Sequence, residues 1–85
     1  MSTQEDDEKI TLDELFDGQA WLAEELAERL EWSVERVRRK MIQLENYGLV
    51  KHVREGRYNW YFSTKDYLRY LEANPEQEIK EILRK

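Results

Sequence analysis

The chain has 85 residues, enough for one small domain, and its 19 acidic and 14 basic residues give a net charge of −5. It contains no cysteine, which excludes disulfides and thiolate metal sites. The polar first residues lack the apolar core of a secretory signal, and no apolar run approaches the roughly 20 residues of a membrane span, so we expect a cytoplasmic protein without membrane contact.

Charge is unevenly distributed along the chain. Residues 1–28 carry ten acidic residues and one basic residue, residues 29–57 carry eight basic and four acidic, and residues 58–85 carry five of each. A protein that binds a phosphate backbone needs a local positive surface and not a positive total. The acidic total therefore leaves nucleic-acid binding open. The acidic residues at the start predict a disordered acidic tail over residues 1–9.

The first third of the chain predicts two short helices with an extended segment between them. Thr11 and Glu14 have the spacing of a capping box, which predicts a helix over about residues 11–17. Leucines and alanines at helical spacing predict a second helix over about residues 22–30. Residues 19–21, between the two helices, have the length of a short strand.

The third predicted helix, about residues 33–46, carries most of the basic residues. Ser33 suits its N-cap, where it would accept a hydrogen bond from the backbone N–H of residue 35 or 36. Val34, Val37, Met41 and Leu44 recur at spacings of three and four and form the predicted buried stripe. Arg36, Arg39 and Gln43 lie on the opposite face, with Arg38 and Lys40 flanking them. Gly48 fits the left-handed position after the helix.

The remaining chain predicts a hairpin and two further helices. Val50–Arg54 and Arg57–Phe62 read as antiparallel strands joined at Glu55–Gly56. Thr64 begins a fourth helix, and Asn74–Pro75 predicts the start of a fifth over about residues 75–84. The fold class predicted is α+β, with one main core: Leu26, Val37, Met41, Leu44, Leu49, Trp60 and Phe62.

No pattern in the sequence indicates an enzyme, a metal site or a cofactor. His52 is the only histidine and has no cysteine partner, so neither a metal site nor a hydrolytic triad can be assembled around it. The three glycines are isolated, which excludes a phosphate-cradling loop. We therefore expect no catalytic residues, no cofactor and no small-molecule ligand.

The segment LAEELAERL-EWS-VERVRRKMIQLENYGLV, followed by the predicted hairpin, resembles the winged helix-turn-helix superfamily of bacterial, archaeal and phage regulators. The resemblance covers about residues 10–63. It implies a three-helix core plus a β-hairpin wing, with one or two additional C-terminal helices. It also implies sequence-specific binding of double-stranded DNA by a transcriptional regulator. The recognition helix, about 33–46, would enter the major groove, and the wing, about 51–62, would contact the backbone or minor groove.

The resemblance also assigns roles to individual residues. Arg36, Arg39 and Gln43 would face base edges, and Arg38 and Lys40 would lie nearer the phosphates. The full predicted contact set is Ser33, Glu35, Arg36, Arg38, Arg39, Lys40, Gln43, Arg54 and Arg57. The alternative for the arginines is pairing on the surface, for example between Glu35 and Arg39. Trp32 is better explained as a packing residue beneath the recognition helix.

The amino-acid sequence leaves two questions about binding partners open. Winged helices also serve as protein-interaction modules without DNA binding, and the acidic total suits that class. Residues 64–85 carry apolar groups that the three-helix core does not require. This C-terminal extension either packs on the core or forms the interface of a homodimer.

Overall fold

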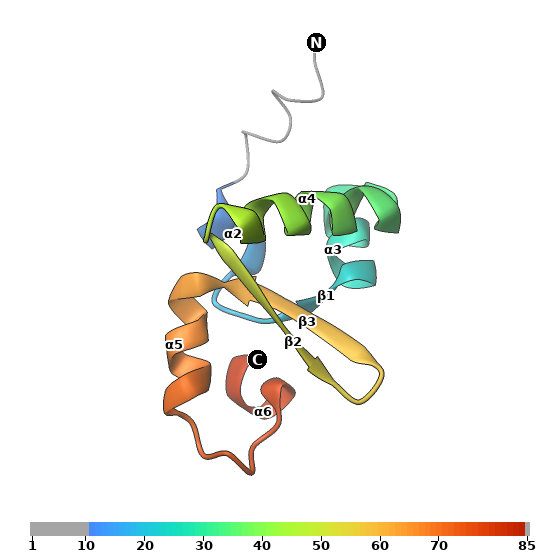
Figure 1. The fold of residues 1–85 in the computed structure, drawn as a ribbon. Helices are drawn as coiled ribbons and strands as arrows, with labels where there is room; N and C mark the ends of the chain where they lie inside the picture. The colour runs from blue at the N-terminus through green and yellow to red at the C-terminus, as the bar shows by residue number, and fades with distance from the viewer. Residues whose placement is uncertain (1–10, 85) are drawn as a thin grey trace.

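The computed structural model describes residues 11–84, so the predicted acidic tail over residues 1–9 lies outside the described part. Five helices and a three-stranded antiparallel sheet are present among the described residues, which confirms the α+β class. The elements follow the order α2 (Leu12–Phe16), β1 (Trp21–Leu22), α3 (Ala23–Leu30), α4 (Val34–Asn46), β2 (Val50–Glu55), β3 (Tyr58–Ser63), α5 (Thr64–Glu72) and α6 (Ile79–Leu83). Figure 1 shows α4 across one end of the β2–β3 hairpin, with α5 and α6 farther along it.

The sheet has the strand order β1-β3-β2, so the short β1 pairs with β3 at the edge opposite β2. Glu55 pairs with Tyr58, which makes Gly56 and Arg57 the two turn residues of the hairpin. The turn thus lies one residue later than predicted. Gly56 has a φ of 59°, a conformation that glycine adopts readily at the first position of a tight hairpin turn.

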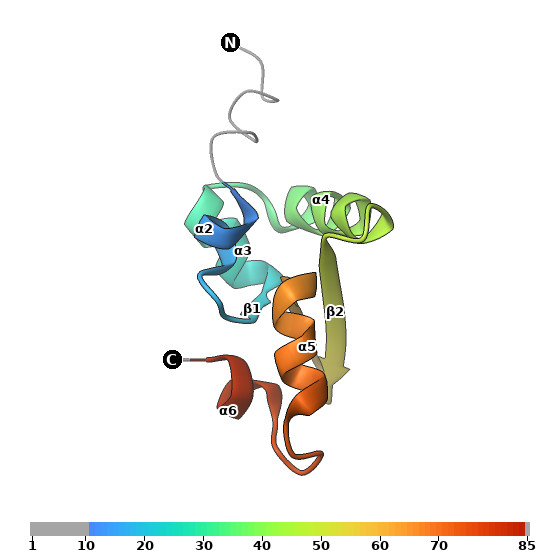
Figure 2. The same cartoon turned by 90° about the vertical axis from the view of Figure 1, so that its left-hand side faces the viewer.

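Helices pack against both faces of the sheet and form two separate cores. The first core joins α2, α3 and α4 to the sheet: Leu15, Phe16, Ala23, Leu26, Ala27, Val37, Met41, Val50 and Tyr61. The second core lies between the sheet and the C-terminal helices: Ala20, Trp60, Phe62, Ile79 and Leu83. In Figure 2, α5 runs beside β2 and α6 lies at the end of the molecule away from α4.

The prediction of one main core was wrong in two respects. Trp60 and Phe62 belong to the second core, while Tyr61 between them joins the first, because successive strand residues point to opposite faces of a sheet. Leu49 is 46% exposed and lies outside both cores. It precedes the fully buried Val50 at the start of β2, and the same alternation turns its side chain outward. Leu44 is only partly buried.

The last helix is shorter than predicted. It spans Ile79–Leu83 and not 75–84, because Asn74 forms a local turn instead of starting a helix. The Asn74 side-chain oxygen accepts a hydrogen bond from the backbone N–H of Glu76, and its carbonyl accepts one from Gln77. The helix begins where a carboxylate oxygen of Glu55, from the hairpin, accepts a hydrogen bond from the Ile79 N–H at 2.8 Å.

A partly buried ion pair ties the end of the chain to α3. Arg84 donates two hydrogen bonds to the carboxylate of Glu25, at 2.6 and 2.9 Å, and a third to the Ala20 carbonyl. The same carboxylate accepts the backbone N–H of Leu22 at 2.9 Å. The hydrogen bond from Arg84 lowers the pKa of Glu25, and this effect exceeds the opposing effect of burial.

Candidate nucleic-acid interface

The orientation of α4 determines which of its side chains face solvent. The Ser33 hydroxyl caps the helix by accepting a hydrogen bond from the Arg36 N–H at 3.2 Å, as predicted. Val37 and Met41 are fully buried in the first core. Since side chains three and four residues apart share one side of a helix, the burial of this stripe turns the basic residues between its members toward solvent.

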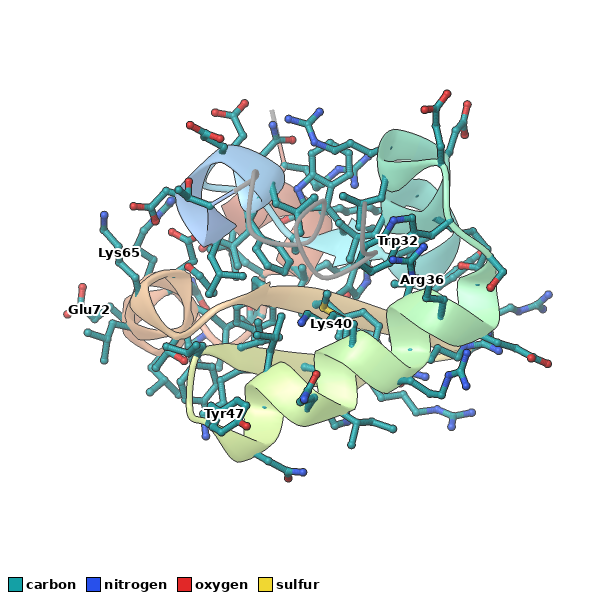
Figure 3. All side chains as sticks on the ribbon, turned by 90° about the horizontal axis from the view of Figure 1, so that it is seen from above. Trp32, Arg36, Lys40, Tyr47, Lys65 and Glu72 are labelled. Atoms are coloured by element: carbon teal, nitrogen blue, oxygen red, sulfur yellow. The ribbon has the colours of Figure 1, made fainter. Side chains whose placement is uncertain are left out.

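A shallow depression, which we call the outer-face depression, lies along α4. It is lined by Trp32, Arg36, Arg39, Lys40, Ile42, Gln43 and Asn46. The guanidinium carbon of Arg36 lies 3.8 Å from the ring centroid of Trp32, so the guanidinium stacks on the indole. Figure 3 shows Arg36 and Lys40 along one side of α4, with Trp32 next to Arg36. The outer-face depression brings together four of the predicted contact residues: Arg36, Arg39, Lys40 and Gln43.

A second hollow, which we call the hairpin hollow, lies between α3, α4 and β3. It is lined by Ala23, Glu24, Arg38, Arg57, Tyr58, Asn59 and Tyr61. Arg38 forms an ion pair with Glu24 at 3.6 Å, but both side chains are more than half exposed, so the pair holds Arg38 only weakly. Burial raises the pKa of Tyr61 above the ordinary value of a tyrosine phenol. The hairpin hollow therefore joins one predicted contact residue from α4 to one from the hairpin turn.

The other predicted contact residues lie in neither hollow. Ser33 is occupied as the cap of α4, and Glu35 is exposed in its first turn. The surface ion pair considered between Glu35 and Arg39 does not form. The Arg54 side chain folds back along the hairpin and donates to the Gly56 carbonyl at 3.1 Å.

Eight residues that line these hollows were not among the predicted contacts, and Trp32, Ile42 and Asn59 are three of them. Trp32 was given a packing role only, yet its ring also supports Arg36. Ile42 is 58% exposed, and its spacing of three from Arg39 would have placed it on the same face. Asn59 lines the hairpin hollow, and nothing in its local sequence indicates this.

Three arginines elsewhere in the described chain have structural partners. Arg29, Arg69 and Arg84 donate hydrogen bonds to the backbone carbonyls of Glu14, Gly18 and Ala20, respectively. These three arginines therefore connect distant segments of the fold. By contrast, Arg39 and Arg57 make no hydrogen bond or ion pair with any residue between 11 and 84. The cations that remain open to a ligand thus include one on α4 and one at the hairpin turn.

Residues 11–84 were also searched for a metal site and for a membrane-spanning helix. No group of three or more histidine, aspartate or glutamate side chains in this range could hold a metal ion. Within the same range, every helix is too short or too polar to cross a membrane. Comparisons with protein-family models, with curated proteins and with solved structures find no match to this chain.

Proposed function

We propose that the chain is a winged helix-turn-helix protein that binds double-stranded DNA sequence-specifically, as a transcriptional regulator does. The element order supports this: helix, strand, two helices joined by a short turn, and a hairpin. The sheet order β1-β3-β2, in which the short β1 pairs with the hairpin strand β3, is compatible with a winged-helix arrangement. In this proposal α4 is the recognition helix and the β2–β3 hairpin is the wing.

The distribution of cations is the observation that carries the proposal. Arg36, Arg39 and Lys40 line the outer-face depression, and Arg38 lies on the α4 side of the hairpin hollow. Arg57 reaches that hollow from the wing. Positive charge concentrated on one helix and an adjacent hairpin provides the local footprint that phosphate binding requires, even in an acidic chain.

The proposed contact residues fall into two groups, those that suit base edges and those that suit phosphates. Arg39 and Gln43 lie one helical turn apart in the outer-face depression, next to Arg36, and suit base edges in the major groove. Arginine fits guanine because its fork donates two hydrogen bonds to O6 and N7. Arg38, Lys40 and the two wing arginines suit phosphates. In the first turn of α4, Glu35 would accept a hydrogen bond from a cytosine amine, and Ser33 lies at the helix N-terminus, a position that suits a phosphate.

The second candidate function is a winged-helix protein-interaction module without DNA binding. Ile42 favours it, because an exposed isoleucine in the middle of a charged depression suits an apolar partner surface. The net charge of −5 also opposes long-range attraction to DNA.

Binding to a random-sequence duplex as a function of salt distinguishes the two functions. DNA binding predicts that the logarithm of the association constant falls linearly with the logarithm of salt concentration, by about 0.9 for each phosphate neutralised. Arg39→Gln combined with Arg57→Gln should make this slope shallower by about one to two. Lys80→Gln, which lies on α6, is the matched control and should leave the slope unchanged. Absence of binding at low salt would refute the proposal and favour the protein-interaction module.

A further inference from the structure

One face of α5 has no partner within the described chain. Its inner face packs through Tyr67 and Tyr70 against Phe62 of the second core. On the outer side, Leu68 is 61% exposed and Leu71 is 57% exposed. Two leucines so exposed on one nine-residue helix are an apolar surface that a second macromolecule can cover.

The apolar surface continues beyond α5. Thr64, at the first turn of α5, donates hydrogen bonds to the carbonyls of Gly48 and Leu49, so the two segments are adjacent. Leu49 and the nearby Tyr47 are 46% and 70% exposed. We define the α5 face as the surface formed by Leu68, Leu71 and their neighbours Leu49 and Tyr47.

Opposite charges lie at the two ends of the α5 face. Lys65 precedes Leu68 by three residues, and Glu72 follows it by four. Seven residues span two helical turns, so the two backbone positions lie on the same side of α5, about 10 Å apart along its axis. Figure 3 shows Glu72 projecting from α5 away from the rest of the molecule, whereas Lys65 lies on the side of α5 toward α2 and lines a hollow there with Asp13 and Asp17. Neither Lys65 nor Glu72 forms an ion pair with any described residue.

We infer that the α5 face binds a second copy of this chain, with the two α5 helices antiparallel. A two-fold axis through the interface near Leu68 and perpendicular to α5 places the leucines of both copies together. The same axis places Lys65 opposite Glu72 of the partner subunit, and the symmetric pair forms at the other end. A closed two-fold interface of this kind requires a self-complementary surface.

The arrangement of charges favours a second copy of the chain over other apolar partners, and an antiparallel pair of helices over a parallel one. An antiparallel pair satisfies both charges twice, whereas a parallel pair places lysine beside lysine and glutamate beside glutamate. A leucine surface alone would accept many apolar partners. The two opposite charges lie at nearly equal distances on either side of Leu68. A two-fold rotation about Leu68 therefore brings the lysine of one copy opposite the glutamate of the other. This inference goes beyond the proposed function and does not depend on DNA binding.

Sedimentation equilibrium of the full chain tests the inference first. We expect a mass of twice 10.4 kDa at high micromolar concentration. Leu68→Asp should return the mass to a single chain, while Ile42→Asp should leave the dimer intact. Ile42 is a matched control because its exposure of 58% resembles that of Leu68. A monomer at every concentration up to millimolar would overturn the inference, and so would a dimer that survives Leu68→Asp.

Charge reversal gives a second and independent test. Lys65→Glu and Glu72→Lys should each weaken the dimer, roughly tenfold in Kd, because each reversal replaces two attractions with two repulsions. An equimolar mixture of the two variants should recover tight association, since a mixed dimer restores both ion pairs. Glu28→Lys, on an exposed site of α3, is the charge-matched control. Circular dichroism checks that each variant is folded. Failure of the mixture to associate better than either variant would exclude this antiparallel pairing.

Discussion

At the scale of single residues, the arginines of α4 differ in how firmly they are held. Arg36 is stacked on Trp32, whereas Arg38 is held only by an exposed ion pair with Glu24. Arg39 has no partner among the described residues. An arginine without an intramolecular partner gives up no existing interaction when it binds a base. Arg39 is therefore the residue whose removal should affect the proposed DNA binding most directly.

We predict that Arg39→Ala weakens binding to a preferred duplex by about 1–3 kcal/mol and relaxes base preference at one position. Fluorescence anisotropy against a panel of single-base variants measures both effects. Lys80→Ala, which lies away from α4, should change neither. Equal weakening on all duplexes would assign Arg39 to a phosphate. Unchanged affinity would count against the DNA-binding proposal.

The second prediction at this scale concerns the pH dependence of stability. Arg84 lowers the pKa of Glu25 in the folded state, so folding favours the ionised carboxylate. This contribution is fully present at pH values above the ordinary pKa of 4.5 and is lost as the pH falls through the lower folded-state value. Glu25→Gln should therefore cost about 1–2 kcal/mol at neutral pH and much less at pH 3. Urea unfolding at both pH values measures the free energy that the substitution costs. An equal cost at the two pH values would contradict the prediction.

At the scale of elements, the β2–β3 hairpin and the last helix depend on each other. Glu55 accepts the first N–H of α6, so a side chain next to the hairpin turn serves as the cap of a helix 24 positions later. Arg57, two residues away, is open to the hairpin hollow. Two nearby positions of the hairpin therefore have separate roles, one in stability and one in the proposed binding of DNA.

Substitutions at these two positions should separate those roles. Glu55→Ala should destabilise the chain by about 0.5–2 kcal/mol, the usual cost of losing a helix cap. Arg57→Ala should leave the melting temperature within about two degrees, since exposed substitutions change stability little, and should weaken DNA binding. Thermal melts and anisotropy on both variants give the comparison. The assignment fails if Arg57→Ala lowers stability as much as Glu55→Ala does.

Local patterns in the sequence predicted the elements whose ends are determined locally. The Thr11 and Glu14 capping box, the Ser33 cap and the left-handed Gly48 are all present. The prediction failed at Asn74, where the cap of the last helix comes from Glu55 instead. A contact between such distant residues leaves no local periodicity or capping pattern. The boundary of α6 therefore required the tertiary structure.

At the scale of the whole molecule, the sequence again predicted the features of the core and of the candidate site that depend on local spacing. It did not predict those that depend on tertiary packing. Helical spacing identified the exposed basic face of α4, and the structure brings four of its predicted residues into the outer-face depression. Spacing did not show that Arg38 and Arg57 share a separate hollow, because that depends on how the hairpin packs on α3 and α4. Alternation along β3 was visible in the sequence. The second core was not, because it exists only once α5 and α6 cover the far face of the sheet.

The two cores share one thin sheet, so we expect them to unfold together. Tyr61 belongs to the first core and Trp60 and Phe62 to the second, which means that adjacent residues of β3 are held from opposite sides. Loosening the C-terminal helices therefore removes support from the strand that the first core also needs. The C-terminal extension would then be part of the folding unit and not an accessory to it.

Ile79→Ala tests this coupling, because Ile79 is fully buried in the second core and far along the chain from α4. The substitution should cost about 2–5 kcal/mol, as large-to-small changes in a packed core usually do. We expect hydrogen exchange of the most protected α4 amides to accelerate by the factor that corresponds to this cost. Met41→Ala, in the first core, is the matched control and should accelerate the same amides in proportion to its own cost. If α5 and α6 unfolded as a separate unit, Ile79→Ala would leave the protection of α4 unchanged, since local opening exposes only the amides of the segment that opens.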